Sequence, residues 1–196
     1  MYTKRQMAVL YVAATLTVAF AGAATWLEIK PPAPPLERYG QLPPFALTNQ
    51  DGGRVTLDDL KGKVWLADFV YTTCPGPCPI ISAHMGRLSR ELPADARIVS
   101  FSTDPDNDTP AVLKAYAKRF GAGADWTFLT GPKDKMYALI QHGFMLPIMA
   151  PAGAQIVHST RIMLVDKSGA VRGLYDGTTS DPDAQILADI RRLQAE

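Results

Sequence analysis

Two cysteines, Cys74 and Cys78, are the only thiols in this chain of 196 residues. They lie in the segment DFVYTTCPGPCPII, residues 68–81, separated by three residues and flanked by prolines. Two thiolates this close can form a reversible disulfide, cross-link the chain structurally, or supply two soft ligands to a metal ion. A structural cross-link would close a loop of about five residues, for which the chain-entropy model gives the smallest stabilisation. The pattern therefore favours redox or metal chemistry.

A metal centre usually needs a third ligand, and the sequence offers three histidines. His84 shares the apolar stripe of an expected helix and His142 lies near the end of another, so we expect packing and capping roles for them. His158 instead precedes a buried strand in QIVHSTRIMLVD, and ligands in sheet-centred folds gather where strand ends and loops converge. His158 is the histidine best placed to join the cysteines, although spacing alone does not settle the point.

Two methionines, Met145 and Met149, carry thioethers, which like thiolates are soft ligands and can bind a soft metal ion such as Cu(I). Their spacing around Pro147 in an apolar segment is more typical of packing or of a surface that faces a partner. We therefore do not expect them to be copper ligands.

Three aspartates, Asp104, Asp106 and Asp108, resemble a cation-binding loop in STDPDNDTP, residues 102–110. A helix is expected to open directly after them, with Thr109 as its N-cap and Pro110 as its first residue. Turn and cap chemistry is the simpler interpretation of the aspartates.

The elements that position the cysteines follow from hydrophobic patterning. Residues 63–71 form a nearly continuous apolar run, typical of a strand covered on both faces, and a helical repeat begins near residue 80. Unpaired N–H groups and the helix dipole stabilise negative charge at a helix start, which lowers the pKa of a thiol there. Pro75 and Pro77 stiffen the bridge between the two cysteines, and Pro79 suits the first turn of the helix.

The remaining pattern completes one domain, which we expect at residues 45–196. The expected elements are a hairpin at 45–57, a strand at 97–103, a helix at 109–119, a strand at 126–131, a helix at 133–143, a hairpin at 159–177 and a helix at 181–194. This order predicts an α/β sandwich with a mixed central sheet. The formal net charge of +1, with no basic stripe, gives no electrostatic basis for binding nucleic acid.

The first 44 residues predict attachment to a membrane. Residues 6–27 carry no formal charge, and as a helix they would span about 33 Å, enough for the hydrocarbon core of a bilayer. We expect a cytoplasmic N-terminus at residues 1–6, because Lys4 and Arg5 precede the apolar run, and a transmembrane anchor at 7–27. A cleaved signal peptide ending near Ala21–Ala23 is the alternative. Residues 28–44 contain six prolines and are expected to form an extended linker.

These motifs together resemble the Sco/SenC family of membrane-anchored copper proteins. The resemblance covers nearly everything after the linker and is carried by FVYTTCPGPCP, STDPDNDTP, WTFLTG and HSTRIMLVDKSGAVRGLYDG. It implies a thioredoxin-like fold in which Cys74, Cys78 and His158 bind copper. The chain departs from the family pattern at Val157, where relatives often carry an acidic residue, and this departure bears on the choice of partner.

The resemblance also implies a task and a location. Members of the family help to assemble the copper A centre of cytochrome c oxidase by delivering copper, by reducing the receiving cysteines, or both. We therefore expect one copper ion per chain, as Cu(I) or as Cu(II) with a fourth ligand, and we expect the copper-centre subunit of the oxidase and other periplasmic copper carriers as partners. The expected location is a bacterial inner membrane, spanned once, with the domain in the periplasm.

Three other interpretations are to be compared with this one: a thiol-disulfide oxidoreductase, a zinc site and a peroxidase. A thioredoxin-like thiol-disulfide oxidoreductase would use Cys74 and Cys78 as a redox-active pair without a metal. The C-x₃-C spacing, against C-x₂-C in thioredoxins, and the absence of a proline directly before His158 disfavour it. Zinc accepts similar ligands to copper, and the sequence does not exclude it. A peroxidase is disfavoured because Tyr71 stands three residues before Cys74, where related peroxidases place a threonine.

Overall fold

The computed structural model describes residues 3–28, 34–151 and 154–196, and of residues 19–28 it describes only the backbone. The chain divides into two compact units, Met1–Pro35 and Leu36–Glu196. Part of the expected linker, residues 29–33, lies outside the described residues, as do the side chains of the alternative cleavage site at 21–23.

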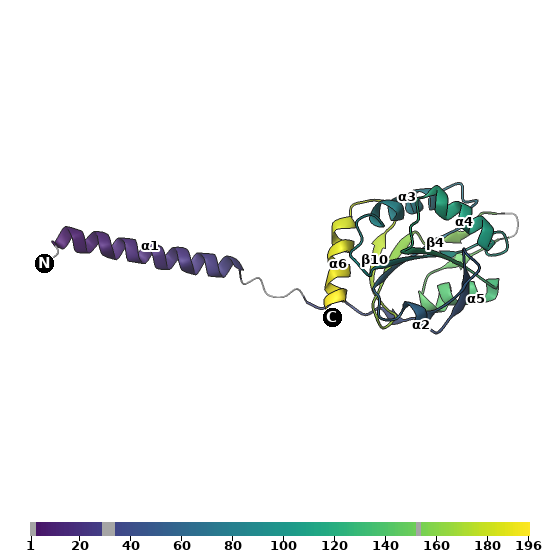
Figure 1. Ribbon diagram of the computed structural model, residues 1–196, viewed down its shortest axis with the longest axis horizontal. Coiled ribbons are helices and arrows are strands. Elements are labelled where there is room, and N and C mark those ends of the chain that lie inside the picture. Colours follow the sequence, from purple (N-terminus) through teal and green to yellow (C-terminus); the bar gives the residue numbers. More distant parts are fainter. Residues whose placement is uncertain (1–2, 29–33, 152–153) are drawn as a thin grey trace. The chain divides into compact units, whose positions relative to one another are not determined.

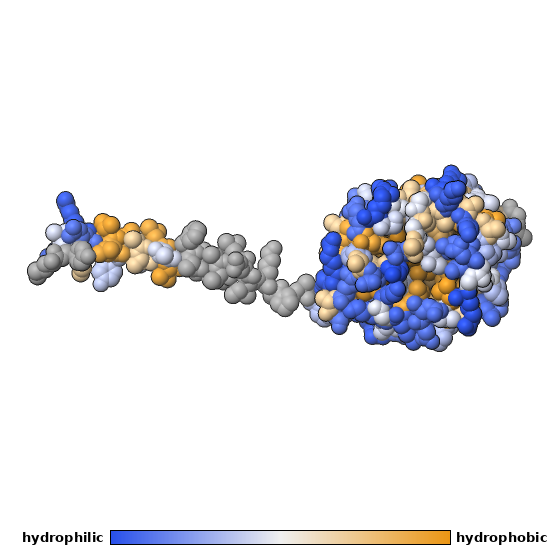
Figure 2. All heavy atoms as spheres, viewed as in Figure 1, coloured by the Kyte–Doolittle hydropathy of each residue, from blue (hydrophilic) through white to orange (hydrophobic). Residues whose placement is uncertain are grey.

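The N-terminal unit consists of helix α1 (Lys4–Glu28), which contains the helix expected at residues 7–27. Figure 2 shows hydrophilic residues at the start of this helix, followed by mainly hydrophobic ones along the part whose side chains are described. Within the described part of the chain, no helix meets the combination of length and apolar character required to cross a membrane.

The larger unit is built on a mixed sheet, eight-stranded within the described residues, in the order β1-β10-β9-β4-β5-β6-β2-β3 (Figure 1). Strands β4, β5 and β6 are parallel neighbours, and the other neighbouring pairs are antiparallel. The strands are β1 (Gly40–Gln41), β2 (Ala46–Asn49), β3 (Arg54–Thr56), β4 (Trp65–Val70), β5 (Arg97–Ser102), β6 (Trp126–Thr130), β9 (Arg161–Val165) and β10 (Ala170–Asp176).

Helices cover both faces of this sheet, as Figure 1 shows for α3 and α4 on one side and α2 and α5 on the other. One buried cluster joins the sheet to α3 (Cys78–Leu88), α4 (Pro110–Arg119) and α6 (Asp183–Ala195). A second cluster joins the opposite face to α2 (Leu57–Leu60), α5 (Lys133–Ala138) and the π-helix η1 (Leu139–Gly143). Strand β4 serves both layers, because Leu66 and Val70 enter the first cluster and Trp65 and Phe69 enter the second.

The α/β sandwich with a mixed central sheet is confirmed, and each expected strand and helix of the domain is present with small shifts at its ends. Thr109 caps α4 as expected, since its side chain accepts a hydrogen bond from the N–H of Val112. Several features were not expected. The helix predicted at 133–143 changes to π geometry at Leu139, the short helix α2 follows the first hairpin, and a small second sheet pairs β7 (Ile148–Met149) with β8 (Val157–His158).

The boundary between linker and domain needs a correction, because residues 36–44 belong to the folded unit. Gly40 and Gln41 form the edge strand β1 against β10, and Leu42 is buried. The proline content of this stretch suggested an extended spacer. The burial of Leu42 and the backbone pairing of β1 instead add it to the edge of the sheet.

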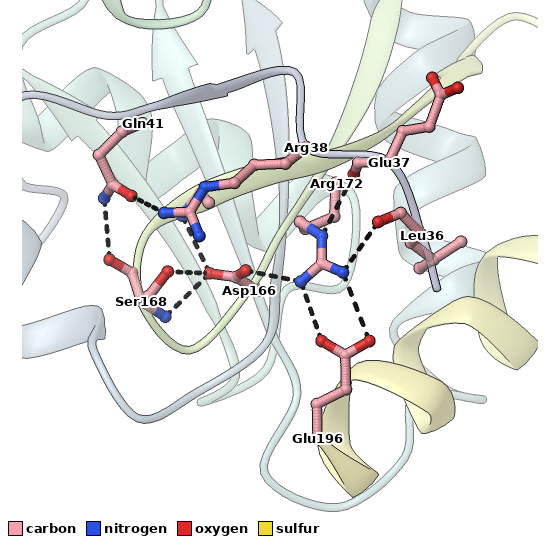
Figure 3. Close-up of polar contacts among 9 residues, drawn as sticks. Leu36, Glu37, Arg38, Gln41, Asp166, Ser168, Arg172 and Glu196 are labelled. Carbon is pink, nitrogen blue, oxygen red and sulfur yellow. Dashed lines mark hydrogen bonds and ion pairs between the residues drawn. The ribbon is translucent and has the colours of Figure 1, made fainter. Parts of the chain in front are cut away.

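A single guanidinium joins both ends of this unit (Figure 3). The side chain of Arg172 donates to the backbone oxygens of Leu36 at 2.9 Å and Glu37 at 3.2 Å. It also forms ion pairs with Asp166 and with Glu196, each at 2.9 Å. Because Arg172 is largely buried, these contacts are screened less than surface ion pairs. We call this group the Arg172 clamp.

Replacing Arg172 with alanine should lower the free energy of unfolding by about 2–4 kcal/mol, because several partly buried acceptors lose a charged donor. Urea titration measures the loss. Lysine should restore only part of it, since an ammonium group lacks the planar fork of guanidinium. The exposed Arg87 on α3 provides a control of equal charge, and Arg87→Ala should change stability by less than about 0.5 kcal/mol. Equal effects of the two alanine variants would contradict a stabilising clamp.

Candidate metal-binding site

The two cysteines lie at the junction of β4 and α3, as the sequence predicted. Beyond the end of β4 the chain turns tightly, and the N–H of Cys74 donates to the backbone oxygen of Tyr71 at 3.2 Å. Cys78 is the first residue of α3. Both are free cysteines, Cys78 being fully buried and Cys74 8% exposed.

His158 closes the small sheet at the end of β8, and its ring reaches the buried cysteine. The Nε2 atom of His158 lies 3.4 Å from the Sγ atom of Cys78. The Nδ1 atom lies 2.9 Å from the backbone oxygen of Ser159, an acceptor only, so Nδ1 carries the proton of the neutral ring. Nε2 therefore presents its lone pair to the thiol. Metal-bound histidines show the same arrangement, with the second ring nitrogen donating to a carbonyl.

Burial keeps this imidazole neutral. It lowers the pKa of His158, and the hydrogen bond to Ser159 only partly opposes the effect. Binding a metal ion to His158 at neutral pH therefore displaces no proton from Nε2.

The two thiols differ in acidity because their surroundings differ. Burial opposes ionisation of Cys74, but hydrogen bonds from the Cys78 side chain, from the N–H groups of Cys78 and Gly76, and from Tyr71 outweigh it and lower the pKa of Cys74. Burial, followed by the hydrogen bond to Cys74, raises the pKa of Cys78. The lowering expected at the helix start thus falls on Cys74, which receives the N–H groups, and the expectation was wrong for Cys78.

Tyr71 connects the cysteine turn to the histidine. Its ring meets the ring of His158 edge to face, with 5.7 Å between the centroids. Burial, followed by the hydrogen bond with Cys74, raises the pKa of the Tyr71 phenol. Tyr71 remains a neutral donor at physiological pH, so it can support a thiolate at Cys74 while it fixes the plane of His158.

One residue from the loop of three aspartates, Asp108, stabilises the turn at residues 71–74 that carries Cys74. Asp108 is buried and accepts hydrogen bonds from the hydroxyl and N–H of Thr72, at 2.6 and 3.2 Å, and from the hydroxyl of Ser102 at 2.6 Å. The side chain of Asn107 donates to Asp104 at 2.8 Å, and Lys133 pairs with Asp106 at 2.6 Å. The contact of Asn107 with Asp104 agrees with the turn chemistry predicted for the segment, whereas the contacts of Asp108 and Asp106 with distant residues were not predicted.

Asp68 is the unusual group of this region. It lies on β4 between Leu66 and Val70, on the face that α3 covers, and it is fully buried. Its Oδ1 atom accepts the hydroxyl hydrogen of Ser100 at 2.5 Å, while no described residue bonds to Oδ2. Burial raises the pKa of Asp68 to about 7.

The other candidate ligands lie elsewhere. His84 lies on the buried face of α3, where its ring contacts the backbone oxygen of Gly177 and the carboxylate of Asp183. His142 is exposed at η1 and lines a groove beside Pro43 and Phe45. Neither histidine contacts the cysteines. The burial of His84 agrees with the packing role expected for it, and the capping role expected for His142 stays a prediction. Within the described residues, no three His, Cys, Asp or Glu side chains form a ready-made metal cluster.

The fold and this dithiol–imidazole site define a class of protein: a thioredoxin-like domain with a cysteine pair at a helix start and a histidine from a late loop. A family model described as SCO1/SenC matches residues 35–195. The chain belongs to this family. The thioredoxin-like fold expected from the sequence is confirmed by its solved relatives.

Three solved structures illustrate the similarity. A SCO1/SenC family lipoprotein from Bacillus anthracis is 36% identical, with a TM-score of 0.77, covering 83% of this chain and all of that one. BsSco, studied for a disulfide switch and described as a Sco-family cytochrome c oxidase assembly protein, is 36% identical, with a TM-score of 0.75, covering 82% and 97%. Bradyrhizobium japonicum ScoI with copper bound is 27% identical, with a TM-score of 0.65, covering 79% and 99%.

Two residues of the site carried no recognised signal in the sequence. Tyr71 was noted for its distance from Cys74 but not for its contact with His158, which lies 87 residues later in the chain. Asp68 interrupts the apolar run of β4, and a charged residue in a strand buried on both faces is itself a signal for a special environment.

Asp68 should make stability depend on pH. Its ordinary pKa is 3.8 and its folded pKa is about 7, so between these values the folded state binds more protons than the unfolded state. Stability therefore falls as pH rises through this window. Asp68→Asn removes the titrating group and with it this loss. The free energy of unfolding of the variant minus that of wild type should therefore increase by about 4 kcal/mol from pH 4 to pH 8.

Urea titrations of the metal-free, reduced protein at several pH values measure this difference. Asp176→Asn is the control, because a hydrogen bond from Thr178 lowers the pKa of Asp176 and the expected trend has the opposite sign. Parallel stability curves for wild type and Asp68→Asn would contradict the assignment.

Proposed function

We propose that the protein is a copper-binding metallochaperone that delivers copper to the copper A centre of cytochrome c oxidase, reduces the cysteines of that centre, or does both. The observation that carries the proposal is the contact between His158 and Cys78, in which a neutral imidazole with a fixed tautomer presents its free nitrogen to a thiol at 3.4 Å. The copper-bound relative and the relative described as an oxidase assembly protein support it.

The proposed ligands are Cys74, Cys78 and His158, and they fit Cu(I). Thiolates and imidazole are soft or intermediate donors, and Cu(I) accepts three of them. One ion per chain is proposed, with Cu(II) held when a fourth ligand joins. In the metal-free arrangement, the hydrogen bond from Tyr71 to Cys74 and the one from His158 to the backbone oxygen of Ser159 hold the ligand side chains close to one another, which limits the ordering needed when copper binds.

The cysteine pair also supports redox control. Copper binds thiolates, so oxidation of Cys74 and Cys78 to a disulfide would empty the site. The disulfide switch described for BsSco supports this part of the proposal. We propose a copper-loaded form under reducing conditions and an empty disulfide form under oxidising ones.

A thiol-disulfide oxidoreductase without a metal is the second candidate. The difference in acidity between the two cysteines favours it, because a thiol of lowered pKa attacks a disulfide and a buried neighbour of raised pKa resolves the product. Such a protein would need both cysteines but not His158.

Substitution of the ligands separates the two candidates. Wild type should bind one Cu(I) per chain, and alanine at Cys74, Cys78 or His158 should weaken the affinity by at least about 100-fold, because a two-ligand site remains. Competition with a Cu(I) chelator under reducing conditions measures this affinity. His84→Ala and His142→Ala are controls, since neither ring contacts the cysteines. Unchanged affinity in His158→Ala, with disulfide reduction intact, would support the oxidoreductase.

We also propose that the apolar run of residues 7–27, which extends beyond the described side chains, anchors the protein in a bacterial inner membrane, with its N-terminus in the cytoplasm and the copper domain in the periplasm. The charge-free run of residues 6–27, preceded by Lys4 and Arg5, supports this orientation. The lipoprotein relative from Bacillus anthracis is consistent with a family that works at membranes.

Two arginines in the helix should abolish the attachment. Each of Val12→Arg and Leu16→Arg costs about 2.5–3.5 kcal/mol for insertion at the centre of a membrane helix. After expression in a bacterium and alkaline extraction, the wild-type chain should remain with the membranes and the double variant should not. Val12→Leu with Leu16→Ile is the apolar control. Recovery of the full-length wild-type chain in the soluble fraction would contradict the anchor.

A further inference from the structure

The two segments that frame the copper site carry no charged residue. Residues 69–83 contain both cysteines, residues 143–160 contain His158, and neither segment includes Asp, Glu, Lys or Arg, although 20% of the chain is charged. The contact between Cys78 and His158 joins the segments in space. The two segments that carry the ligands therefore meet as an uncharged stretch of chain, which we call the neutral zone.

Large apolar side chains project from this neutral zone. Ile80, two residues after Cys78, is 55% exposed, Met149 is 60% exposed and Val157 is 53% exposed. Met149 and Val157 are direct partners in the β7–β8 pair, so they share one face of the small sheet. We call these three residues, with the exposed Pro75 and Gly76, the apolar rim.

The register of the small sheet separates the rim from the ligands. Ile148 pairs with His158, and this pair faces the opposite side from Met149 and Val157, toward the interior, where Ile148 is 3% exposed. The sheet thus directs His158 inward and Met149 and Val157 outward. Exposed apolar groups of this size lower solubility, so their concentration around a recessed site points to a surface that a partner covers.

The depth of the ligands identifies that partner. Cys78 is fully buried and Cys74 nearly so, and the ring of His158 is half-buried. Copper held there passes to another protein only when the acceptor's own ligands come within bonding distance. An acceptor that approaches so closely must cover the residues that frame the ligands, which are those of the rim.

We propose that the apolar rim is the docking surface for the protein that receives copper, and that the acceptor meets it with an uncharged, apolar contact surface. This inference rests on the proposed function and adds the chemistry of the interface. The centres of protein interfaces are depleted in charge and enriched in methionine, as the rim is. Burial of apolar area drives the association, so docking responds weakly to salt, unlike association steered by charge.

Copper transfer from the full-length protein in detergent tests the inference. The probe is the purified soluble copper A domain of the oxidase from the same cell, with reduced cysteines. Transfer is followed from Cu(I)-loaded wild type at about 20 mM and 500 mM salt, and its second-order rate constant should change less than about threefold. Val157→Glu and Met149→Glu should each slow transfer at least about tenfold, because a carboxylate must then be desolvated at the interface.

Two matched measurements make the test specific. Val112→Glu, at a similarly exposed apolar residue on α4 outside the charge-free segments, should leave the transfer rate unchanged. Cu(I) affinity should stay within about twofold of wild type in all three variants, which separates docking from metal binding.

The outcomes are distinguishable. Normal transfer by Val157→Glu and Met149→Glu would overturn the rim as the docking surface and leave the proposed function intact, as would a wild-type rate that falls steeply with salt. Self-association of wild type that both substitutions abolish, without an effect on transfer, would assign the rim to a second copy of this chain and overturn the inference. Failure of wild type to bind Cu(I) would instead overturn the proposed function.

Discussion

The contact between Cys78 and His158 is the interaction on which the site depends. Its partners are separated by 80 residues and come from a helix start and a late strand, so tertiary structure has to bring them together. Three further constraints fix it: the carbonyl of Ser159 sets the tautomer, the ring of Tyr71 sets the plane, and the hydrogen bonds of Asp108 hold the turn that carries Cys74. The site is therefore built by tertiary structure, although each of its ligands is recognisable in the sequence.

The acidity of the site follows from the same arrangement. Burial keeps His158 neutral and Cys78 protonated, while the N–H groups of the bridge favour a thiolate at Cys74. One nucleophilic sulfur, one protected sulfur and one free imidazole nitrogen thus lie together. A dithiol reductant needs the two sulfurs and a metal carrier can use all three groups, which explains why the geometry is compatible with two activities at one site.

Local patterns predicted most of the fold and the ligands. The apolar run at 63–71, the Thr109–Pro110 helix start and the hairpin at 159–177 were recognisable because each depends on residues close in sequence. The small sheet and the edge strand at Gly40–Gln41 were not, because short pairings depend on distant partners. Tyr71 and Asp68 were missed as site residues for the same reason: their roles arise from neighbours that the chain brings back.

The Arg172 clamp has a mechanical consequence. Asp166 directly follows strand β9, whereas His158 lies before the start of this strand. Arg172, which binds both Asp166 and the backbone of Leu36, therefore acts at one end of β9, and His158 lies at the other. The guanidinium and its two carboxylates thus fix the start of the folded unit to the far end of this strand. Strand β9, which pairs with β10 on one side and β4 on the other, lies between this fastening point and His158, so loss of the ion pairs at one end of the strand need not displace the imidazole at the other.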